Sequence, residues 1–226
     1  METIPHLKAQ ASQSRRHESS YLRFGKPAFD RIAGAIALLV MAPLMLAIAL
    51  AIKITLGGPV FYSVQVVGKE KRPFPLFRFR TMYVQWSKAK QDAFIEQIVE
   101  DAGQSTDADA RIFKLQSDPR ITPVGKFLRK YSLDQLPSIF NILFGDLSLI
   151  GPRPVRLFEA ARFEAEDEAR FTFKPGLTGM WILNMPRSWE AWVESDKFYI
   201  EHVSPGLDFK ILIRTAFSVS NPTGTS

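Results

Sequence analysis

The sequence predicts a mainly helical α+β protein with a membrane helix near its N-terminus. The run from Ile32 to Ile52 contains no charged residue. Two short runs, 60–67 and 76–82, are rich in β-branched and aromatic residues and predict a small β element. Most of the remaining chain has the apolar spacing or the capping residues of helices. The predicted helices cover residues 87–99, 124–130, 136–144, 155–170 and 207–219.

The uncharged run is long enough to cross a membrane. At about 1.5 Å per residue, a straight helix of this length measures about 30 Å, which is the thickness of a hydrocarbon core. The run is apolar all round, whereas a soluble helix normally keeps one polar face. A membrane helix is therefore favoured over a buried core helix.

Pro43 lies in the middle of this run and should bend it, because proline lacks a backbone N–H and its ring clashes with the preceding turn. Basic residues flank the run on both sides, and such flanks prefer the cytoplasmic face of a membrane. They are Arg15, Arg16, Arg23, Lys26 and Arg31 before the run, and Lys53, Lys69, Lys71, Arg72, Arg78 and Arg80 after it. A re-entrant helix that leaves by the face it entered satisfies both flanks. The sequence favours it over a spanning helix, which is the alternative.

The charge balance and the absence of cysteine limit the function. The 226 residues carry a formal net charge of +6, and the pI is about 9.6. This excess indicates an anionic partner: a nucleic acid, anionic lipid headgroups or a phosphorylated substrate. The uncharged run argues against a nucleic acid. Without cysteine, disulfides, thiolate catalysis and cysteine-ligated zinc are excluded, and the three histidines are too scattered to predict a histidine site.

The two ends of the chain differ in character. Residues 1–25 are polar and basic and predict a disordered leader rather than a secretory signal, because the apolar run begins too late. Near the other end, Lys210 and Arg214 lie four residues apart on an otherwise apolar helix, which predicts an amphipathic helix at the membrane interface. Three tryptophans allow either interfacial anchoring or core packing. They are Trp181, Trp189 and Trp192.

Two arginines follow each other on one side of the second predicted strand. Apolar and basic residues alternate in 76–82, so a strand places Arg78 and Arg80 on the same face. Because a guanidinium offers a planar fork of donors, we interpret this face as one that binds phosphate. A solvated strand face is the alternative.

The stretch from Ser132 to Pro154 combines acids, an apolar run and an arginine between prolines, which suits a phosphate site beside an apolar surface. Asp134 lies at a helix start in either of two registers. Ser132 and Gln135 can form a capping box, or Asp134 itself can be the cap, which moves Pro137 into the tolerant first turn. In both registers, the free N–H groups of the helix start can also hold a phosphate.

The second half of this stretch predicts an anion-binding arginine. Gly145 and Asp146 end the helix 136–144. Further on, Pro152 and Pro154 restrict the backbone on both sides of Arg153, so this side chain loses little freedom when it binds an anion. An exposed arginine in a turn is the alternative.

The same stretch, SLDQLPSIFNILFGDLSLIGPRP, resembles the core motif of the bacterial sugar transferases, the monotopic polyprenyl-phosphate phosphoglycosyl transferases. That motif reads roughly S-L-D-E-L-P-Q-x-x-N-x-x-x-G-D-M-S-L-V-G-P-R-P. Further matches follow in the family's order between Phe24 and about Ser220. They are Phe29-Asp30, a proline within the apolar run, GPVFY at 58–62, Arg78–Met82, SDPRITPVGKFLRK at 117–130, KPGLTG at 174–179, and Asp196 with Tyr199 for a D-x-x-Y pattern.

The resemblance implies an enzyme that moves a sugar-1-phosphate from a UDP-sugar to a polyprenyl phosphate, commonly undecaprenyl phosphate, and releases UMP. Such a reaction starts the assembly of exopolysaccharide, capsule, lipopolysaccharide or another glycan. It implies a re-entrant helix in the bacterial inner (cytoplasmic) membrane, with the active site at the cytoplasmic face. A homo-oligomer or an assembly with other glycan-pathway proteins fits this setting.

The resemblance also assigns roles to residues. Asp134 would be the covalent nucleophile and a ligand of Mg²⁺, and Gln135 occupies the second catalytic position. The cations facing the transferred phosphoryl group would be Mg²⁺, Arg153 and Arg129, with Arg78 and Arg80 adding to the field. Four residues would have structural or membrane roles. They are Pro43, Asp146, Pro152 and Pro154. We expect a leader (1–25), a membrane helix (26–56), a catalytic domain (57–220) and a tail (221–226).

The sequence departs from the family pattern at several positions. Gln135 stands in place of glutamate; its amide can cap a helix but cannot take a proton or bring a charge to a metal. Ala42 replaces the serine before the intramembrane proline, and Val66 replaces an arginine. The segment after Gly179 lacks the family's Q-V-x-G-R, and Arg187 would stand in for its arginine. A non-catalytic membrane scaffold of the same fold is therefore the alternative to an enzyme.

Overall fold

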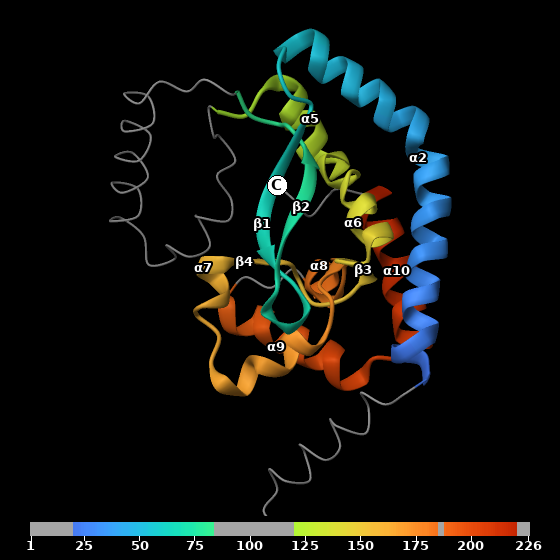
Figure 1. Ribbon diagram of the computed structural model, residues 1–226, viewed down its shortest axis with the longest axis vertical. Helices are drawn as coiled ribbons and strands as arrows, with labels where there is room; N and C mark the ends of the chain where they lie inside the picture. The colour runs from blue at the N-terminus through green and yellow to red at the C-terminus, as the bar shows by residue number, and fades with distance from the viewer. Residues whose placement is uncertain (1–19, 84–119, 185–187, 221–226) are drawn as a thin grey trace, which may run out of the picture.

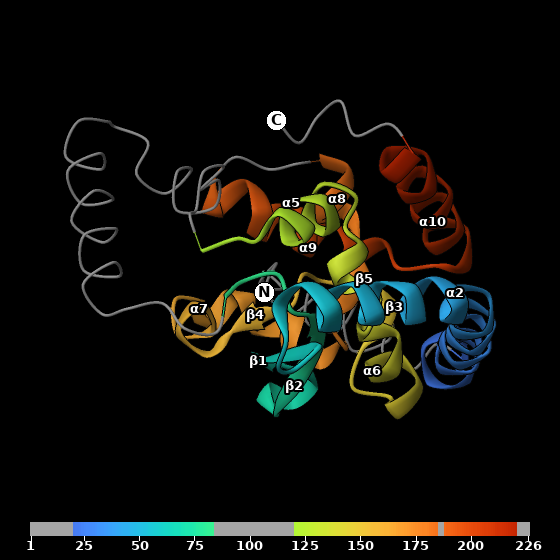
Figure 2. The same ribbon diagram turned by 90° about the horizontal axis from the view of Figure 1, so that it is seen from above.

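The computed structural model describes residues 20–83, 120–184 and 188–220 (Figure 1). A long helix, α2 (Lys26–Leu56), runs along one side of the molecule, and the small β element and the other helices lie beside it (Figures 1 and 2). The predicted helix 87–99 lies outside the described residues. The described part confirms the mainly helical α+β class.

A π-helical turn, η1 (Tyr21–Gly25), leads directly into α2. The sequence predicted these residues as part of a disordered leader, and the structure corrects that boundary. The Tyr21 hydroxyl donates a hydrogen bond of 2.6 Å to Oδ2 of Asp208, and this long-range contact orders the turn. The rest of the predicted leader, residues 1–19, lies outside the described residues.

Helix α2 is continuous over 31 residues, with Pro43 inside it. Figure 1 shows that it changes direction about halfway along its length, as expected for a proline in a helix interior. Helix α2 ends at Gly57, which has a positive φ of 59° and donates its N–H to the Lys53 carbonyl. Glycine adopts this backbone conformation without steric cost.

One side of α2 packs on the domain and the other is exposed and apolar. Met45, Ile48 and Ile52 join a core cluster with Phe79 and Leu128. Within the described residues, α2 with η1 is the one helix long and apolar enough to cross a membrane. Its exposed large apolar side chains are Phe29, Ile32, Ile36, Leu39, Val40, Leu44, Leu46, Leu50 and Ile54. An apolar surface of this size indicates contact with lipid or another apolar partner.

The β element is a hairpin with one short addition. Strands β1 (Phe61–Val67) and β2 (Pro73–Phe79) pair antiparallel, and β4 (Val155–Arg156) pairs with the other edge of β1. The first predicted strand is confirmed, whereas the second begins three positions earlier than predicted and ends at Phe79. Separately, β3 (Ser148–Ile150) pairs parallel with β5 (Gly176–Thr178).

The central stretch folds as α5 (Pro123–Lys130), a 3₁₀ turn η3 (Leu133–Gln135) and α6 (Ser138–Phe144). Neither predicted register is right. Ser132 has a left-handed backbone and makes no capping bond, and the N-cap of α6 is Pro137. Asp134 therefore lies in η3, one turn ahead of α6, because a proline is accepted at the start of a helix but not in its fifth position.

The predicted helix 155–170 is not continuous. Val155 pairs with Val67 in the sheet, and the α-helical part is Leu157–Ala160, α7. A 3₁₀ helix, η4 (Ala165–Thr172), follows. Arg170, within η4, is buried, and its guanidinium pairs with Asp196 at 3.0 Å.

The C-terminal part comprises α8 (Met180–Asn184), α9 (Trp189–His202) and α10 (Pro205–Ser220). The predicted helix 207–219 is confirmed by α10, which lies beside the first part of α2 (Figures 1 and 2). Phe209, Ile213 and Phe217 recur every fourth residue as an exposed apolar stripe on α10. The three tryptophans belong to packing: Trp192 is buried, and Trp181 and Trp189 pack against its cluster.

Two polar side chains of α6 cover the free edge of β2, which is the outer strand of its sheet. Asn141 is fully buried; its Oδ1 accepts from the Phe77 N–H at 3.0 Å, and its Nδ2 donates to the Pro75 carbonyl at 2.8 Å. Ser138 donates to the Phe77 carbonyl at 2.8 Å. These bonds pair the backbone N–H and C=O groups at the edge of β2, which would otherwise need a neighbouring strand.

Asn141→Leu should therefore destabilise the fold by about 2–4 kcal/mol, because it removes two bonds and leaves a buried N–H and a buried C=O unpaired. Chemical denaturation in detergent micelles checks the value. Ser63→Ala, at an exposed position of β1, is the control. An unchanged midpoint for Asn141→Leu would contradict this account of the β2 edge.

Candidate active site

Asp134 is the centre of the site. Its side chain is 10% exposed, and Oδ2 lies 3.4 Å from a terminal nitrogen of Arg78, which projects from β2. Burial raises the pKa of the Asp134 carboxyl, and the positive charges of Arg78 and then Arg129 lower it. The two arginines thus stabilise an ionised carboxylate in a place that water reaches poorly.

Arg129 is held beside this carboxylate by α5. Its Nε donates to Oγ1 of Thr81 at 3.1 Å. Thr122, the N-cap of α5, accepts from the Gly125 N–H at 2.8 Å and donates to the Thr81 carbonyl at 3.2 Å. A Cβ at Gly125 would lie 2.1 Å from that carbonyl oxygen, so only glycine permits this approach of α5 to residue 81.

Arg153 is held by protein contacts on several sides. Its guanidinium lies 4.1 Å from the centre of the Trp192 ring, and a terminal nitrogen lies 3.5 Å from Oε1 of Glu159. Burial lowers the pKa of Arg153, Glu159 and Asp196 raise it, and Arg78 lowers it. Arg78 is thus near both Asp134 and Arg153, and the structure brings these three predicted residues into one region.

The backbone of Arg153 is fixed by a buried ion pair as well as by its prolines. The Arg153 N–H donates to Oδ1 of Asp196 at 3.2 Å, and its carbonyl accepts from Arg170 at 2.7 Å. Arg170 and Asp196 also pair with each other at 3.0 Å. Burial raises the pKa of Asp196 to about 6, although Arg170 and Arg153 lower it.

The sequence did not predict the supporting roles of Arg170, Glu159 and Trp192. Asp196 was noted only as part of a D-x-x-Y pattern. That pattern was the one available signal, since Asp196 and Tyr199 lie one turn apart on α9 and both contact the chain around Arg153.

Arg80 has a different environment from Arg78. Its terminal nitrogen donates to the Leu56 carbonyl at 3.2 Å and to the Gly57 carbonyl at 2.7 Å, so Arg80 caps the C-terminal end of α2. Strand β2 ends at Phe79, so Arg80 lies just beyond it and binds the end of α2, whereas Arg78 lies beside Asp134. Arg80 remains 93% buried by relative area, with Nε and the other terminal nitrogen unpaired among the described residues. Arg187 lies outside the described residues.

Gln135 follows Asp134 in η3 and is partly exposed. Within the described residues no group of three or more histidine, cysteine or acidic side chains could hold a metal ion. Mg²⁺, however, is usually bound by one or two carboxylates, with water and substrate phosphates as the other ligands. Asp134 supplies one such carboxylate, which is the minimum donor set for a magnesium ion that is bound together with a phosphate.

The other predicted residues have structural places. Pro152 is buried, and its carbonyl accepts from the Gly176 N–H at 2.8 Å; Pro154 follows Arg153 directly. Asp146 is exposed just after α6, and its N–H donates to the Asn141 carbonyl at 3.0 Å. The preceding Gly145 has a φ of 88°, which favours glycine at a helix end.

Comparison with known proteins identifies the family. A family model described as "Bacterial sugar transferase" matches residues 21–222. The undecaprenyl-phosphate galactose phosphotransferase of Salmonella typhimurium is 36% identical over 197 residues, which cover 86% of this chain and 40% of that protein. The exopolysaccharide production protein ExoY of Rhizobium meliloti is 35% identical over 202 residues, covering 88% of this chain and 87% of ExoY.

A third relative, the undecaprenyl-phosphate glucose phosphotransferase of Komagataeibacter xylinus, is 35% identical over 214 residues, covering 89% of this chain and 37% of that protein. The chain therefore spans about two fifths of the length of two of these relatives and most of the length of ExoY. The matched residues include η1, α2 and every described element around Asp134. The chain belongs to the bacterial sugar transferase family.

Proposed function

We propose that this chain is a phosphoglycosyl transferase, which moves a sugar-1-phosphate from a UDP-sugar to a polyprenyl phosphate such as undecaprenyl phosphate. The names of the relatives, which include galactose and glucose phosphotransferases and an exopolysaccharide production protein, support this class of reaction. The observation that carries the proposal is the buried carboxylate of Asp134 beside Arg78 and Arg129, with Arg153 near Arg78.

In the first step, an oxygen of the Asp134 carboxylate attacks the β-phosphorus of the UDP-sugar. The bond from that phosphorus to the bridging oxygen breaks, and UMP leaves with the electron pair. Arg78 and Arg153 stabilise the charge on the transferred phosphoryl group, as preorganised cations do in a poorly hydrated site. When bound at Asp134, Mg²⁺ would supply further positive charge to the phosphates.

In the second step, a phosphate oxygen of the lipid carrier attacks the phosphorus held on Asp134. The bond to the carboxylate breaks, so Asp134 is regenerated and a sugar linked through a diphosphate to the lipid is released. Splitting the transfer in this way uses one nucleophile for two chemically similar displacements. Gln135 would orient groups by hydrogen bonds, because a neutral amide takes no part in proton transfer.

We also propose that α2 is re-entrant and that the site lies at the cytoplasmic face of the bacterial inner membrane. Both ends of α2 attach to the same domain. At the first end, Lys26 contacts Asp208 at 2.6 Å and Asp30 contacts Ser148 at 2.7 Å. At the other end, Arg80 binds the Leu56 and Gly57 carbonyls. A spanning helix would carry its two ends to opposite sides of the membrane, which these contacts disfavour.

A non-catalytic scaffold of the same fold is the second candidate. Gln135 favours it, because the slot beside the nucleophile holds no carboxylate. The persistence of Asp134, Arg153 and the contacts that hold them favours the enzyme. The two candidates differ in a single measurable property, the release of UMP.

The wild-type chain in membranes should release UMP from UDP-galactose or UDP-glucose when undecaprenyl phosphate is added. Asp134→Asn should reduce that rate by about a thousandfold or more, because it removes the nucleophile. Glu194→Gln, at an exposed acid of α9, is the matched control and should retain activity. No turnover by the wild-type chain across UDP-sugar donors would support the scaffold.

Arg78→Gln should move the acid limb of the kcat/KM profile to higher pH. The positive charge of Arg78 lowers the pKa of Asp134, which burial raises. Without that charge the carboxylate becomes protonated, and inactive as a nucleophile, at higher pH. Rates at pH 7 should also fall about a hundredfold, because one cation facing the phosphoryl group is lost. Arg72→Gln, exposed on the hairpin turn, is the control and should change neither the pH profile nor the rate at pH 7. If the acid limb of Arg78→Gln stays at the wild-type pH, the proposed effect of the Arg78 charge on Asp134 is contradicted.

The cysteine-free chain permits a direct test of topology. Ser20→Cys and Glu70→Cys lie on opposite sides of α2 in sequence and are both exposed. In sealed inside-out vesicles, a membrane-impermeant thiol reagent should label both positions to a similar extent if α2 is re-entrant. Labelling of only one of them, with full labelling of both after detergent, would establish a spanning helix.

A further inference from the structure

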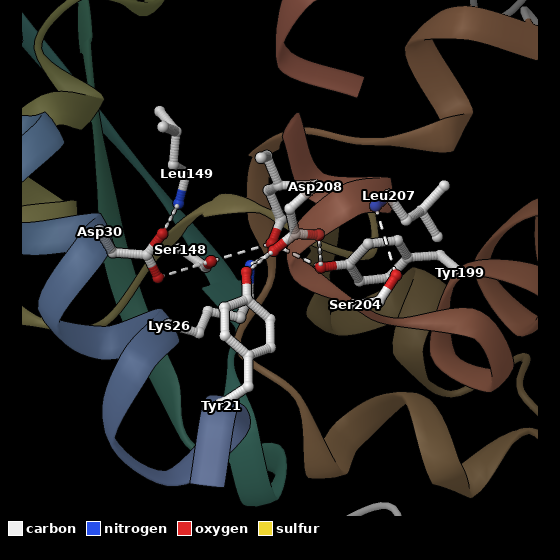
Figure 3. Close-up of polar contacts among 10 residues, drawn as sticks. Tyr21, Lys26, Asp30, Ser148, Leu149, Tyr199, Ser204, Leu207 and Asp208 are labelled. Atoms are coloured by element: carbon white, nitrogen blue, oxygen red, sulfur yellow. Dashed lines mark hydrogen bonds and ion pairs between the residues drawn. The ribbon is translucent and has the colours of Figure 1, made fainter. Parts of the chain in front are cut away.

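A buried polar cluster joins the start of α2 to α9 and α10 (Figure 3). At its centre is Asp208, in the first turn of α10 and 2% exposed. Its Oδ2 accepts from the Tyr21 hydroxyl and from Nζ of Lys26, each at 2.6 Å, and its Oδ1 accepts from the Tyr199 hydroxyl at 2.8 Å. Three donors satisfy this carboxylate, which would otherwise be costly to bury.

The cluster reaches the chain that precedes Arg153. The Tyr199 hydroxyl, which has a single proton, lies 2.8 Å from Asp208 and 3.2 Å from the Ile150 carbonyl, and so its proton is shared between two acceptors. Ile150 ends β3 and is followed by Gly151, Pro152 and Arg153. One turn earlier on α9, Asp196 accepts from the Arg153 N–H. Helix α9 thus contacts both ends of this short loop.

A second connection runs from α2 to the same carbonyl. Asp30 accepts from the Ser148 hydroxyl at 2.7 Å and from the Leu149 N–H at 3.0 Å (Figure 3). The Ser148 hydroxyl also lies 2.9 Å from the Ile150 carbonyl. Two side chains near the start of α2, Lys26 and Asp30, are therefore linked through short contacts to the residue that begins the Arg153 loop.

We propose that Tyr199 and Asp208 are positioning residues. Through them, the position of the first turns of α2 determines the position of the loop that carries Arg153. Neither side chain contacts Asp134 or the Arg153 guanidinium in the described contacts, so both act through the Ile150 carbonyl. Displacement of a charge-stabilising arginine by a fraction of an ångström is enough to reduce a rate. The kinetic part of this inference rests on the proposed transferase function; the structural part does not.

Glycine at 151 makes the loop sensitive to such movement. A Cβ there would lie 2.7 Å from the Lys174 carbonyl oxygen, so the backbone passes closely against the segment before β5. The Gly151 N–H donates to the Thr178 carbonyl at 3.0 Å. The loop is therefore held on one side by β5 and on the other by the contacts of Tyr199 and Asp196, and the loss of either support would loosen it.

Hydrogen exchange of the full chain in phospholipid nanodiscs tests the structural part without any substrate. Tyr199→Phe removes the shared hydroxyl and keeps the ring. We expect exchange in a peptide spanning residues 149–156, which reports the Gly151 and Arg153 amides, to become roughly threefold to tenfold faster. Tyr83→Phe, at an exposed tyrosine, is the control and should leave exchange unchanged.

The connection to α2 is tested by a matched pair at Lys26. Lys26→Met removes the cation that faces Asp208 and should accelerate exchange in the same peptide, although residue 26 is distant in sequence. Lys26→Arg keeps the charge and should largely preserve the wild-type rate. If Tyr199→Phe proves too unstable to purify, the comparison of Lys26→Met with Lys26→Arg still tests whether the cluster holds the Arg153 loop.

Two results would overturn the inference. One is unchanged exchange at 149–156 in both Tyr199→Phe and Lys26→Met. The other is an equal acceleration of exchange in the β1–β2 hairpin, which would mean that the cluster stabilises the whole fold and not this loop in particular. In the UMP-release assay, Tyr199→Phe should lower kcat about fivefold to tenfold with little change in KM for the UDP-sugar. A wild-type chain that releases no UMP would refute the proposed function and leave the exchange results to judge the cluster alone.

Discussion

The attachment of α2 to its domain is the constraint on which the other features depend. A helix surrounded by lipid gains little from the hydrophobic effect when it packs on protein, so a few polar contacts determine its orientation. Here those contacts are Lys26 with Asp208, Asp30 with Ser148, and Arg80 with the last carbonyls of the helix. Each would leave a buried polar group unpaired if the helix rotated or slid.

The candidate site uses the same elements that hold the helix. Strand β2 supplies Arg78 to Asp134 and, just after it ends, Arg80 to α2. Strand β3 supplies Ser148 and Leu149 to Asp30 and continues into the Arg153 loop. Helix α2 and the candidate site therefore share their supporting contacts, and a change in one alters the support of the other.

Much of the fold was predictable because its signals are local. The uncharged run with Pro43, the first strand and helix 207–219 all show in composition and periodicity, and the family motif indicated Asp134 and Arg153. Contacts between distant segments were not predictable in this way. Arg80 binds the carbonyls at the end of α2, and Arg170 pairs with Asp196, which is distant in sequence. A buried charge needs a partner, and the tertiary structure determines which partner lies near it. The predicted helix 155–170 is interrupted because Val155 pairs with Val67 of the distant strand β1.

The glutamine at position 135 changes the electrostatics of the site in two opposing ways. A second carboxylate beside Asp134 would add a ligand for Mg²⁺, but it would also repel the nucleophile's charge and raise its pKa further. With Gln135, the field of Arg78 and Arg129 acts on a single buried carboxylate. In the proposed transferase, the glutamine would thus weaken a magnesium site and leave Asp134 more readily ionised. Arg78, Arg129 and Arg153 would then have to balance more of the phosphate charge, so the proposed function would depend strongly on the support of Arg153 by α9.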